Sequence, residues 1–299
     1  NLAEVRPTLL FSVPRIWNRV YDSLNKKIAK ESPLKRKLML AAIANSAEVQ
    51  KRQRAGQSLG WAGFMNGIYD KLVLSKIKAL LGGRLKFAFS GGAALSKEVG
   101  TFIDNLGIVV YEGYGLTETS PIATANRPGA QKIGSVGQPL PFITVTIDTS
   151  VVEGLEPGVG EVCVSGPNIM QGYHNLPDKT AEVLDEKRTF RTGDLGRIDE
   201  DGYLFLTGRV KEQYKLENGK YVAPAPLEEK LKLSPFVNQI MIHGQNLPFN
   251  TAVLVPDFEQ GKEWAEEQGL SDTSPSARCI DRMICLAKVR PVGGGEIET

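Results

Sequence analysis

The sequence predicts an α/β fold in which part of a large N-terminal domain precedes a small, incomplete α+β domain. Three observations support this fold class: apolar residues at helical spacing open the chain, short strands then alternate with a helix, and strand-like segments dominate after Pro121. We therefore expect a helical arm, parallel α/β layers and a β-rich subdomain, followed by the small domain.

The helical arm comprises three predicted helices. Ser32-Pro33 offers a cap and a first-turn proline for the second helix, and Gly82-Gly83 ends the third. In each helix apolar residues recur on one face with the charges mostly opposite, as is typical of helices that pack on a core. These residues are Ile16, Val20, Leu24 and Ile28 in the first helix, Leu34, Leu38 and Ala42 in the second, and Trp61, Met65, Ile68 and Leu72 in the third.

The next elements predict a parallel sheet. "RLKFAFS" reads as a short strand, "SKEVGTFIDNL" as a helix and "IVVYEGYG" as a second strand. Past Pro121, "FITVTID", "GEVCVSG" and "GYLFLTG" predict strands separated by Gly/Pro turns. After Arg209, "PAPLEEKLKL", "VNQIMIHG", "TAVLVPD" and "FEQGKEWAEEQ" predict helix, strand, strand and helix. Beyond Gly269 no period is sustained, so we expect weak order there.

Composition restricts the classes of function. Hydrophobic residues make up 41% and charged residues 23%, and no stretch of apolar residues is long enough to span a membrane. The net charge of +2 does not suggest a nucleic-acid-binding protein. The segment from Lys26 to Arg54 contains nine Lys/Arg residues and only two Glu residues. This excess of positive charge indicates either a solvated helical face or a surface for anionic lipid or a phosphate-bearing ligand.

The cysteines and the first residue bear on the cellular setting. Cys163, Cys279 and Cys285 lack zinc-ligand spacing and cannot all pair, which favours a reducing, intracellular compartment. The two histidines are too far apart in sequence to suggest a metal site. The chain starts at Asn1 without a signal peptide, so we expect a piece cut from a longer protein.

The stretch "YEGYGLTETSP" has the features of a ligand site. A strand that ends in Gly113 and Gly115 lets the backbone approach a ligand closely. The hydroxyl of Thr117 suits a phosphate oxygen, the carboxylate of Glu118 suits Mg²⁺, and Tyr114 offers a flat face for a base. The alternative is a glycine-rich turn that only joins two elements.

Two further segments carry candidate ligand contacts. "SGGAALS" also lies between a strand and a helix, but it matches neither a dinucleotide loop nor a P-loop. In "FRTGDLGRIDEDGYLFLTGR", Asp194 is predicted in a tight Thr-Gly-Asp turn, where its carboxylate suits the two hydroxyls of a ribose, and Arg209 follows fifteen residues later. The alternative is that Asp194 caps a turn and Arg209 pairs with a surface acid.

Taken in order, these motifs and "KLENGKYVAP" resemble the adenylate-forming superfamily of acyl-CoA synthetases, adenylation domains and luciferases, over roughly residues 5 to 260. "VRPTLLFSVPRIWNRVYDSLNKKI", the helical insertion after it and "YKLENGKYVAPAPLEE" resemble the long-chain fatty acyl-CoA synthetases of the eukaryotic type. The resemblance implies that residues 1–208 are the C-terminal part of the large AMP-binding domain. It likewise makes residues 209–270 a small mobile domain and residues 271–299 an atypical tail.

The resemblance also implies roles for individual residues. The adenine would be bordered by Gly91, Gly92, Ala93 and Tyr114, and Gly115 would also belong to the nucleotide-binding residues. Thr117 would contact phosphate, and Glu118 would bind magnesium.

On the same basis, Asp194 and Arg209 would bind the ribose. Lys211 matches the pivot of the small domain, and Lys215 matches a basic residue near the reacting phosphate and carboxylate.

The implied reaction activates a long-chain fatty acid with ATP and Mg²⁺ to acyl-AMP and then transfers the acyl group to coenzyme A, in the cytoplasm or on the cytosolic face of a membrane. Peripheral membrane association is compatible with this reaction. Two alternatives stay open: an adenylating ligase for another acid, such as an aryl acid, and a non-catalytic nucleotide-binding remnant.

Two features of the family pattern are missing from this sequence. The Ser/Thr/Gly-rich loop that ends in Pro-Lys and wraps the ATP phosphates is absent, and the late catalytic lysine has no match, Lys288 included. We therefore expect these 299 residues to be inactive by themselves.

Overall fold

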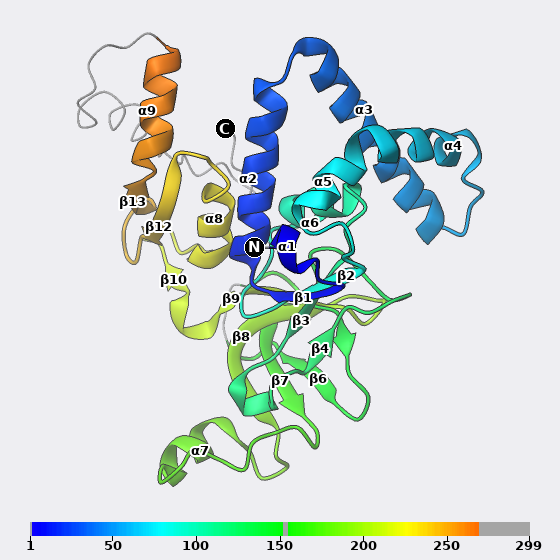
Figure 1. The fold of residues 1–299 in the computed structure, drawn as a ribbon. Helices are drawn as coiled ribbons and strands as arrows, with labels where there is room; N and C mark the ends of the chain where they lie inside the picture. Colours follow the sequence, from blue (N-terminus) through cyan, green and yellow to red (C-terminus); the bar gives the residue numbers. More distant parts are fainter. Residues whose placement is uncertain (1, 152–154, 269–299) are drawn as a thin grey trace. The chain divides into compact units, whose positions relative to one another are not determined.

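The computed structural model describes residues 2–151 and 155–268 (Figure 1). Their contacts group them into two compact units, which are described separately below. The first unit is Asn1–Thr146, Cys163–Arg191 and Ile198–Leu206, and the second is Ile147–Val162, Thr192–Arg197 and Thr207–Thr299. The domain boundary expected at Arg209 stays a prediction.

A five-stranded sheet forms the centre of the first unit. Its parallel part consists of β1 (Leu9–Ser12), β2 (Phe87–Ser90) and β3 (Val110–Tyr114), in that order. The antiparallel strands β4 (Thr124–Ala125) and β5 (Gln138–Pro139) extend it beyond β3. The predicted α/β fold with parallel strands is confirmed, although β1 was not foreseen because four residues are too few to show a strand period.

The helices that precede β3 gather on one side of this sheet (Figure 1). They are α1 (Leu2–Val5), α2 (Pro14–Lys30), α3 (Pro33–Arg54), α4 (Gly60–Tyr69), a π-helical turn (Asp70–Leu74), α5 (Ser75–Leu80) and α6 (Lys97–Asn105). Pro14 and Pro33 each occupy the first turn of a helix, where a missing N–H costs nothing. Of the predicted face of α2, Leu24 and Ile28 are buried and Ile16 and Val20 are half-buried. Trp17, which the prediction did not include, is also buried, and α2 packs against α6.

The apolar stripe of α3 is only half covered. Leu34 is 81% exposed and Leu38 is 38% exposed, whereas Ala42, Ser46 and Val49 further along the same stripe are buried. The difference arises because α3 packs against α4 and α6. Asn45, in the later part of α3, contacts α4 and donates from Nδ2 to the carbonyl oxygen of Ala62 at 3.0 Å.

The apolar face predicted for the third helix does not point into the core, so this prediction is wrong. Trp61 is 74% exposed and Leu72 is 50% exposed, and the buried residues lie further on, at Val73, Leu74 and Ile77. No residue of α4 is buried, and the buried face begins only in the π-helical turn at Asp70–Leu74. The extra residue in such a turn rotates the faces of the helix that follows.

A four-stranded sheet has the order β6 (Thr144–Asp148), β7 (Gly160–Ser165), β8 (Phe190–Ile198) and β9 (Leu204–Arg209). Strands β6, β7 and β9 were predicted. Strand β8 covers the segment "FRTGDLGRI", in which a tight turn was expected, and α7 (Pro177–Val183) was not foreseen. Leu95, Val99 and Ile103 in the first unit, and Leu195 within β8, are among the buried apolar residues.

The remaining part of the second unit begins with a 3-10 turn (Val210–Glu212) and the hairpin of β10 (Tyr214–Lys215) and β11 (Tyr221–Val222). The predicted order of helix, strand, strand and helix follows as α8 (Pro224–Leu231), β12 (Val237–His243), β13 (Thr251–Pro256) and α9 (Phe258–Glu267). Tyr214, Leu216, Ile240 and Ile242 form its buried core.

Several predictions concern residues that the structure does not describe. The atypical tail at 271–299, with Cys279, Cys285 and Lys288, lies outside the described residues. A search of the described helices for one with the length and hydropathy needed to cross a membrane finds none.

Candidate functional site

Two candidate loops leave the parallel sheet at the same edge. Strands β2 and β3 are parallel, and Ser90, the last residue of β2, pairs with Glu112 near the end of β3. Because parallel strands end at one edge, the loop that starts at Gly91 and the turn that starts at Gly115 emerge side by side. The structure thus brings the "SGGAALS" and "GYGLTET" segments together, as ligand sites in open parallel sheets require.

The "SGGAALS" loop is open to a ligand. The N–H of Gly91 donates to the carbonyl oxygen of Ser12 at 3.1 Å, which holds the start of the loop at the sheet. Gly92 has a φ of +82°, a conformation that favours glycine, and a Cβ on either glycine would meet no atom within 4 Å. Gly92 and Ala93 are exposed, so the loop leaves room for another molecule.

Glu112 supports this loop from beneath. Its side chain is buried at 6% exposure, and its Oε2 accepts a hydrogen bond from the N–H of Leu95 at 3.2 Å. The backbone N–H of Gly134 is a second donor to the carboxylate. Burial raises the pKa of Glu112 to about 7, against the smaller opposing effect of these two donors. Sequence reasoning missed this residue, since a glutamate within a strand carries no signal of burial.

Gly113 and Gly115 of the second turn are packed closely against other backbone atoms of the chain. A Cβ on Gly115 would lie 1.9 Å from the carbonyl oxygen of Pro121, and one on Gly113 would lie 3.2 Å from that of Thr124. The absence of a Cβ at Gly115 therefore lets the chain at Pro121 pack closely against it, and the predicted approach of a ligand to these glycines stays a prediction. Tyr114 between them is buried at 7% exposure.

The turn ends in a 3-10 helix, Thr117–Thr119, in which the hydroxyl of Thr119 is buried and that of Thr117 is exposed. Thr119 is fully buried, and its Oγ1 accepts from the N–H of Leu116 at 2.9 Å and donates to the carbonyl oxygen of Leu116 at 3.0 Å. Thr117 is exposed and Glu118 is partly exposed. The two residues predicted to meet phosphate and metal are thus the accessible ones.

A second segment of the first unit fixes Glu118. The hydroxyl of Tyr173 donates to Oε1 of Glu118 at 2.9 Å, and the N–H of Met170 donates to the carbonyl oxygen of Glu118 at 2.9 Å. Asn168 Nδ2 donates to the carbonyl oxygen of Thr119 at 2.9 Å. Burial and then the Glu118 carboxylate raise the pKa of Tyr173. Sequence analysis did not find Tyr173, which lies 55 positions from Glu118.

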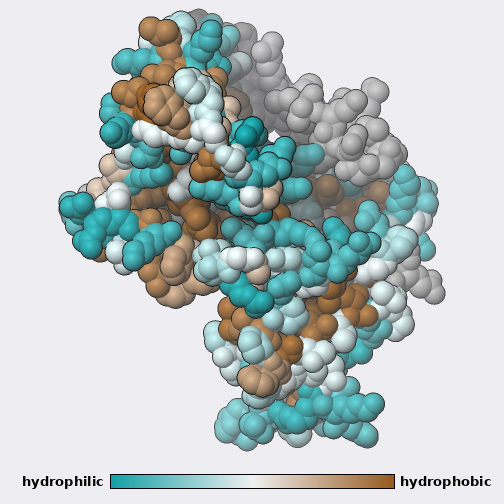
Figure 2. Space-filling model, turned by 90° about the vertical axis from the view of Figure 1, so that its right-hand side faces the viewer, coloured by the Kyte–Doolittle hydropathy of each residue, from teal (hydrophilic) through white to brown (hydrophobic). Residues whose placement is uncertain are grey.

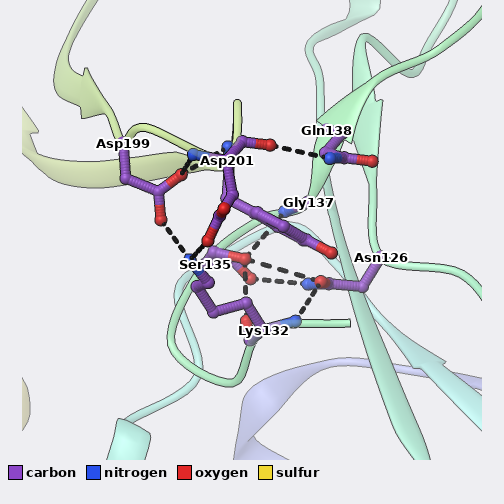
Figure 3. Close-up of polar contacts among 8 residues, drawn as sticks. Asn126, Lys132, Ser135, Gly137, Gln138, Asp199 and Asp201 are labelled. Carbon is purple, nitrogen blue, oxygen red and sulfur yellow. Dashed lines mark hydrogen bonds and ion pairs between the residues drawn. The ribbon is translucent and has the colours of Figure 1, made fainter. Parts of the chain in front are cut away.

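A charged cluster holds the loop between β4 and β5 (Figure 3). Lys132 Nζ lies 2.6 Å from Oδ2 of Asp199 and 2.6 Å from Oδ2 of Asp201, and it lies over the ring of Tyr203. The aspartates raise the pKa of Lys132. Since the same loop supplies the Gly134 N–H to Glu112, the cluster helps to position a donor to the buried carboxylate.

In the second unit, Asp194 and Arg209 are paired. Arg209 Nε lies 3.0 Å from Oδ1 of Asp194, whose side chain is 9% exposed, while that of Arg209 is 57% exposed. Asp194 lies within strand β8, so the expected tight turn is wrong. Gly193 before it has a φ of +72°, which locally distorts the strand, and its N–H donates to Glu161 Oε1 at 3.0 Å.

The two candidate lysines of the second unit are exposed. Lys211 lies in the 3-10 turn Val210–Glu212, directly after β9. Lys215 lies in β10, with its Nζ 5.3 Å from the centre of the Tyr221 ring. Both positions leave the ammonium group accessible.

Metal ligation has one candidate. Over residues 2–151 and 155–268, no group of three or more His, Cys, Asp or Glu side chains is arranged to hold a metal ion. A single accessible carboxylate such as Glu118 matches the way proteins share Mg²⁺ with a phosphate-bearing ligand. Glu118 belongs to the first unit, and Asp194, Arg209, Lys211 and Lys215 belong to the second.

Comparisons with known proteins show the family of this chain. The family model "AMP-binding enzyme" matches residues 1–174, and "AMP-binding enzyme C-terminal domain" matches residues 211–282. The chain is 35% identical over 269 residues to "Long-chain-fatty-acid--CoA ligase FadD15" of Mycobacterium bovis, covering 89% of this chain and 42% of that protein. It is 36% identical over 274 residues to human "Long-chain-fatty-acid--CoA ligase 1", covering 90% of this chain and 38% of that protein.

A solved structure has a similar fold. The A-PCP didomain of carboxylic acid reductase from Segniliparus rugosus, in complex with AMP, matches with a TM-score of 0.57 and 25% identity. The match covers 90% of this chain and 36% of that one. The chain thus spans about two fifths of the length of the curated relatives described above.

Proposed function

The chain belongs to the AMP-binding enzyme family, and on that premise we propose that it is the part of a ligase that activates a long-chain fatty acid with ATP and passes it to coenzyme A. The observation that carries the proposal is the parallel pairing of β2 and β3, which supplies two loops to one sheet edge. The names of relatives at 35% and 36% identity support the choice of acid and thiol.

In the proposed first step, a carboxylate oxygen of the acid bonds to the α-phosphorus of ATP, the bond to the bridging oxygen breaks, and pyrophosphate leaves. The product, acyl-AMP, is a mixed anhydride with a good leaving group. The protein contributes positioning and charge neutralisation. We assign the border of the adenine to Gly91, Gly92, Ala93, Tyr114 and Gly115.

The polar roles follow from accessibility and charge. The exposed hydroxyl of Thr117 donates to a phosphate oxygen. Asp194 accepts from the ribose hydroxyls, and Arg209 holds that carboxylate through the 3.0 Å pair and adds its own donors toward the ribose.

Magnesium fits the residues present at Glu118. One carboxylate oxygen accepts from Tyr173, which leaves the other for a cation that also takes oxygens from the phosphates of ATP. Bound Mg²⁺ supplies neutralisation of the phosphate charge. Tyr173 orients the carboxylate, and the Met170 N–H fixes the backbone that carries it.

In the proposed second step, the thiol of coenzyme A attacks the acyl carbon, the bond to AMP breaks, and the thioester forms. The thiol proton leaves to solvent or to AMP. We place the conformational change between the steps at Lys211, whose 3-10 turn follows the last strand of the four-stranded sheet. Lys215 is assigned to the phosphate and carboxylate of the first step.

The experiment that tests the proposal is acid-dependent exchange of labelled pyrophosphate into ATP by the native protein that contains this chain. We expect exchange with a long-chain fatty acid and little with an aryl acid or without acid. Exchange that depends on the aryl acid would favour a ligase for another acid. AMP binding by calorimetry without exchange under any condition would favour a nucleotide-binding remnant.

A further inference from the structure

The exposed side of α4 and the turn after it carries four apolar residues in line. Trp61 is 74% exposed, Phe64 62%, Ile68 39% and Leu72 50%. Spacings of three and four residues place them on one helix face, and the Trp61 and Phe64 ring centres are 5.3 Å apart. We call these four residues the apolar ridge. Contiguous apolar surface of this kind marks an interaction site on a folded protein.

The opposite side of the same helix already has partners. α4 packs against α3, to which the Ala62 carbonyl oxygen is linked by Asn45, and the helix continues into the buried residues Val73 and Leu74. Figure 2 looks at the side of the molecule on which α4 lies in Figure 1, and it shows apolar surface next to hydrophilic surface there. The ridge is therefore held outward by the packing of its own helix.

The segment that carries the ridge is strongly basic. Residues 33–80 contain nine Lys/Arg and two acids, a surplus of seven, whereas the whole chain has a net charge of +2, so the rest of the chain carries −5. Both acids are engaged, Glu48 with Arg52 at 2.6 Å and Asp70 with Lys78 at 2.8 Å.

The cations lie at both ends of the ridge. Lys51 and Arg54 end α3, and Arg52 Nη1 donates to the carbonyl oxygen of Ser58 in the loop that leads to Trp61. Arg54 pairs with Asp104. Lys71 and Lys76 flank Leu72 and are exposed, and within the described residues no ion pair is seen for Lys51, Lys71 or Lys76.

We propose that the apolar ridge docks on the surface of an anionic phospholipid bilayer. Trp61 and Phe64 enter the boundary between headgroups and acyl chains, where aromatic side chains are favoured, and Lys51, Lys71 and Lys76 face the anionic headgroups. The charge argues against a second copy as the partner, because two such surfaces repel. The inference does not depend on the ligase activity.

The test is sedimentation of the purified 299-residue chain with vesicles of phosphatidylcholine, with and without phosphatidylserine. We expect binding that requires phosphatidylserine and weakens with added salt. We also expect a blue shift of tryptophan emission on binding that is absent from W61F, since Trp17 is fully buried and Trp264 lies on α9 of the second unit, away from the ridge in sequence. The double variant W61A/F64A should bind at least about tenfold more weakly, because a buried Phe contributes on the order of 1.5–3 kcal/mol.

Two variants serve as controls. F142A removes a ring that is 89% exposed in a different part of the first unit, and it should bind vesicles as the wild type does. K51E/K71E should lose the preference for phosphatidylserine. Circular dichroism checks that each variant is folded. We expect each to fold, because the substituted side chains are exposed.

Three outcomes would overturn the proposal. In one, W61A/F64A binds phosphatidylserine vesicles as tightly as F142A does. In another, sedimentation shows a dimer that W61A/F64A disrupts while vesicles do not bind. In the third, the chain binds a polyanion such as heparin but no vesicle.

Discussion

The Tyr173 hydroxyl donates to Oε1 of Glu118 at 2.9 Å, and the two residues come from segments 55 positions apart. This contact links the 3-10 helix that carries the candidate metal ligand to the chain that precedes α7. A carboxylate held on one oxygen has its other oxygen oriented, which is the usual arrangement behind a metal ligand. The pair yields the first two predictions.

Y173F should weaken adenylation without unfolding the protein. Loss of a hydrogen bond to a charged group costs about 1.5–3 kcal/mol, so we expect a decrease of about tenfold or more in kcat/KM for ATP, together with a higher requirement for Mg²⁺. Pyrophosphate exchange at varied Mg²⁺ by the native protein measures both. Y69F, on α4, is the matched control, and an unchanged Mg²⁺ requirement in Y173F would contradict the role.

E118A should remove most of the adenylation. Deleting one preorganised electrostatic contact costs on the order of a hundredfold in rate. The same exchange assay applies, with E182A as the control because Glu182 pairs only with the neighbouring Lys179 in the described contacts. Near-normal exchange in E118A would remove Glu118 from the site.

K211P should impair the second half-reaction more than the first. Proline fixes φ, so it restricts a residue that must change its backbone angles during a domain rotation. Pyrophosphate exchange reports on the first half-reaction and thioester formation from supplied acyl-AMP on the second. K211A keeps the backbone free and serves as the control. An equal loss in both half-reactions would argue against a pivot at this residue.

E112Q should change how stability depends on pH. The pKa of Glu112 is raised from 4.5 to about 7, so the folded state holds its proton more tightly than the unfolded chain does. The resulting stability is present below about pH 4.5 and decreases as pH rises toward 7, by at most roughly 3 kcal/mol.

Urea unfolding of the 299-residue chain across this pH range measures the effect. Glutamine keeps an acceptor for the Leu95 N–H but does not titrate, so E112Q should show a flatter dependence, whereas exposed E182Q should follow the wild type. Parallel curves for E112Q and the wild type would exclude Glu112 as the group responsible.

G115A should destabilise the chain strongly, and G91A should not. The new Cβ would lie 1.9 Å from the Pro121 carbonyl oxygen at position 115, whereas at Gly91 it meets no atom within 4 Å. Overpacking of this kind costs typically 1–3 kcal/mol, and a clash with backbone belongs at the upper end. Thermal unfolding of the two variants gives the comparison, and equal midpoints would show that the turn rearranges.

The sequence predicted those parts of the fold that repeat with a clear period. The helix at Pro14–Lys30, the β2, α6 and β3 succession and the closing helix, strand, strand and helix order all show such a period. β8 was missed because Gly193 and Asp194 read as a turn, yet Gly193 adopts its positive φ within a continuous strand. Apolar spacing predicted the α4 helix but not which of its faces is buried, since that depends on the neighbouring elements.

The candidate site was predicted only where it is local in sequence. Glycines, Thr117 and Glu118 lie within one short motif. Tyr173 and Glu112 could not be found in this way, because a contact across 55 residues and the burial of one strand face arise only when the chain folds. The ion pair of Asp194 with Arg209 joins two predicted residues whose contact follows from neighbouring strands β8 and β9.

The closeness of Gly115 to Pro121 has an evolutionary consequence. Selection for folding alone would preserve this glycine, even in a descendant that had lost its substrate. The exposed hydroxyl of Thr117 has no such constraint from packing and would drift once catalysis ceased. Persistence of threonine and glutamate at positions 117 and 118, more than that of Gly115, therefore distinguishes a working enzyme from its relic.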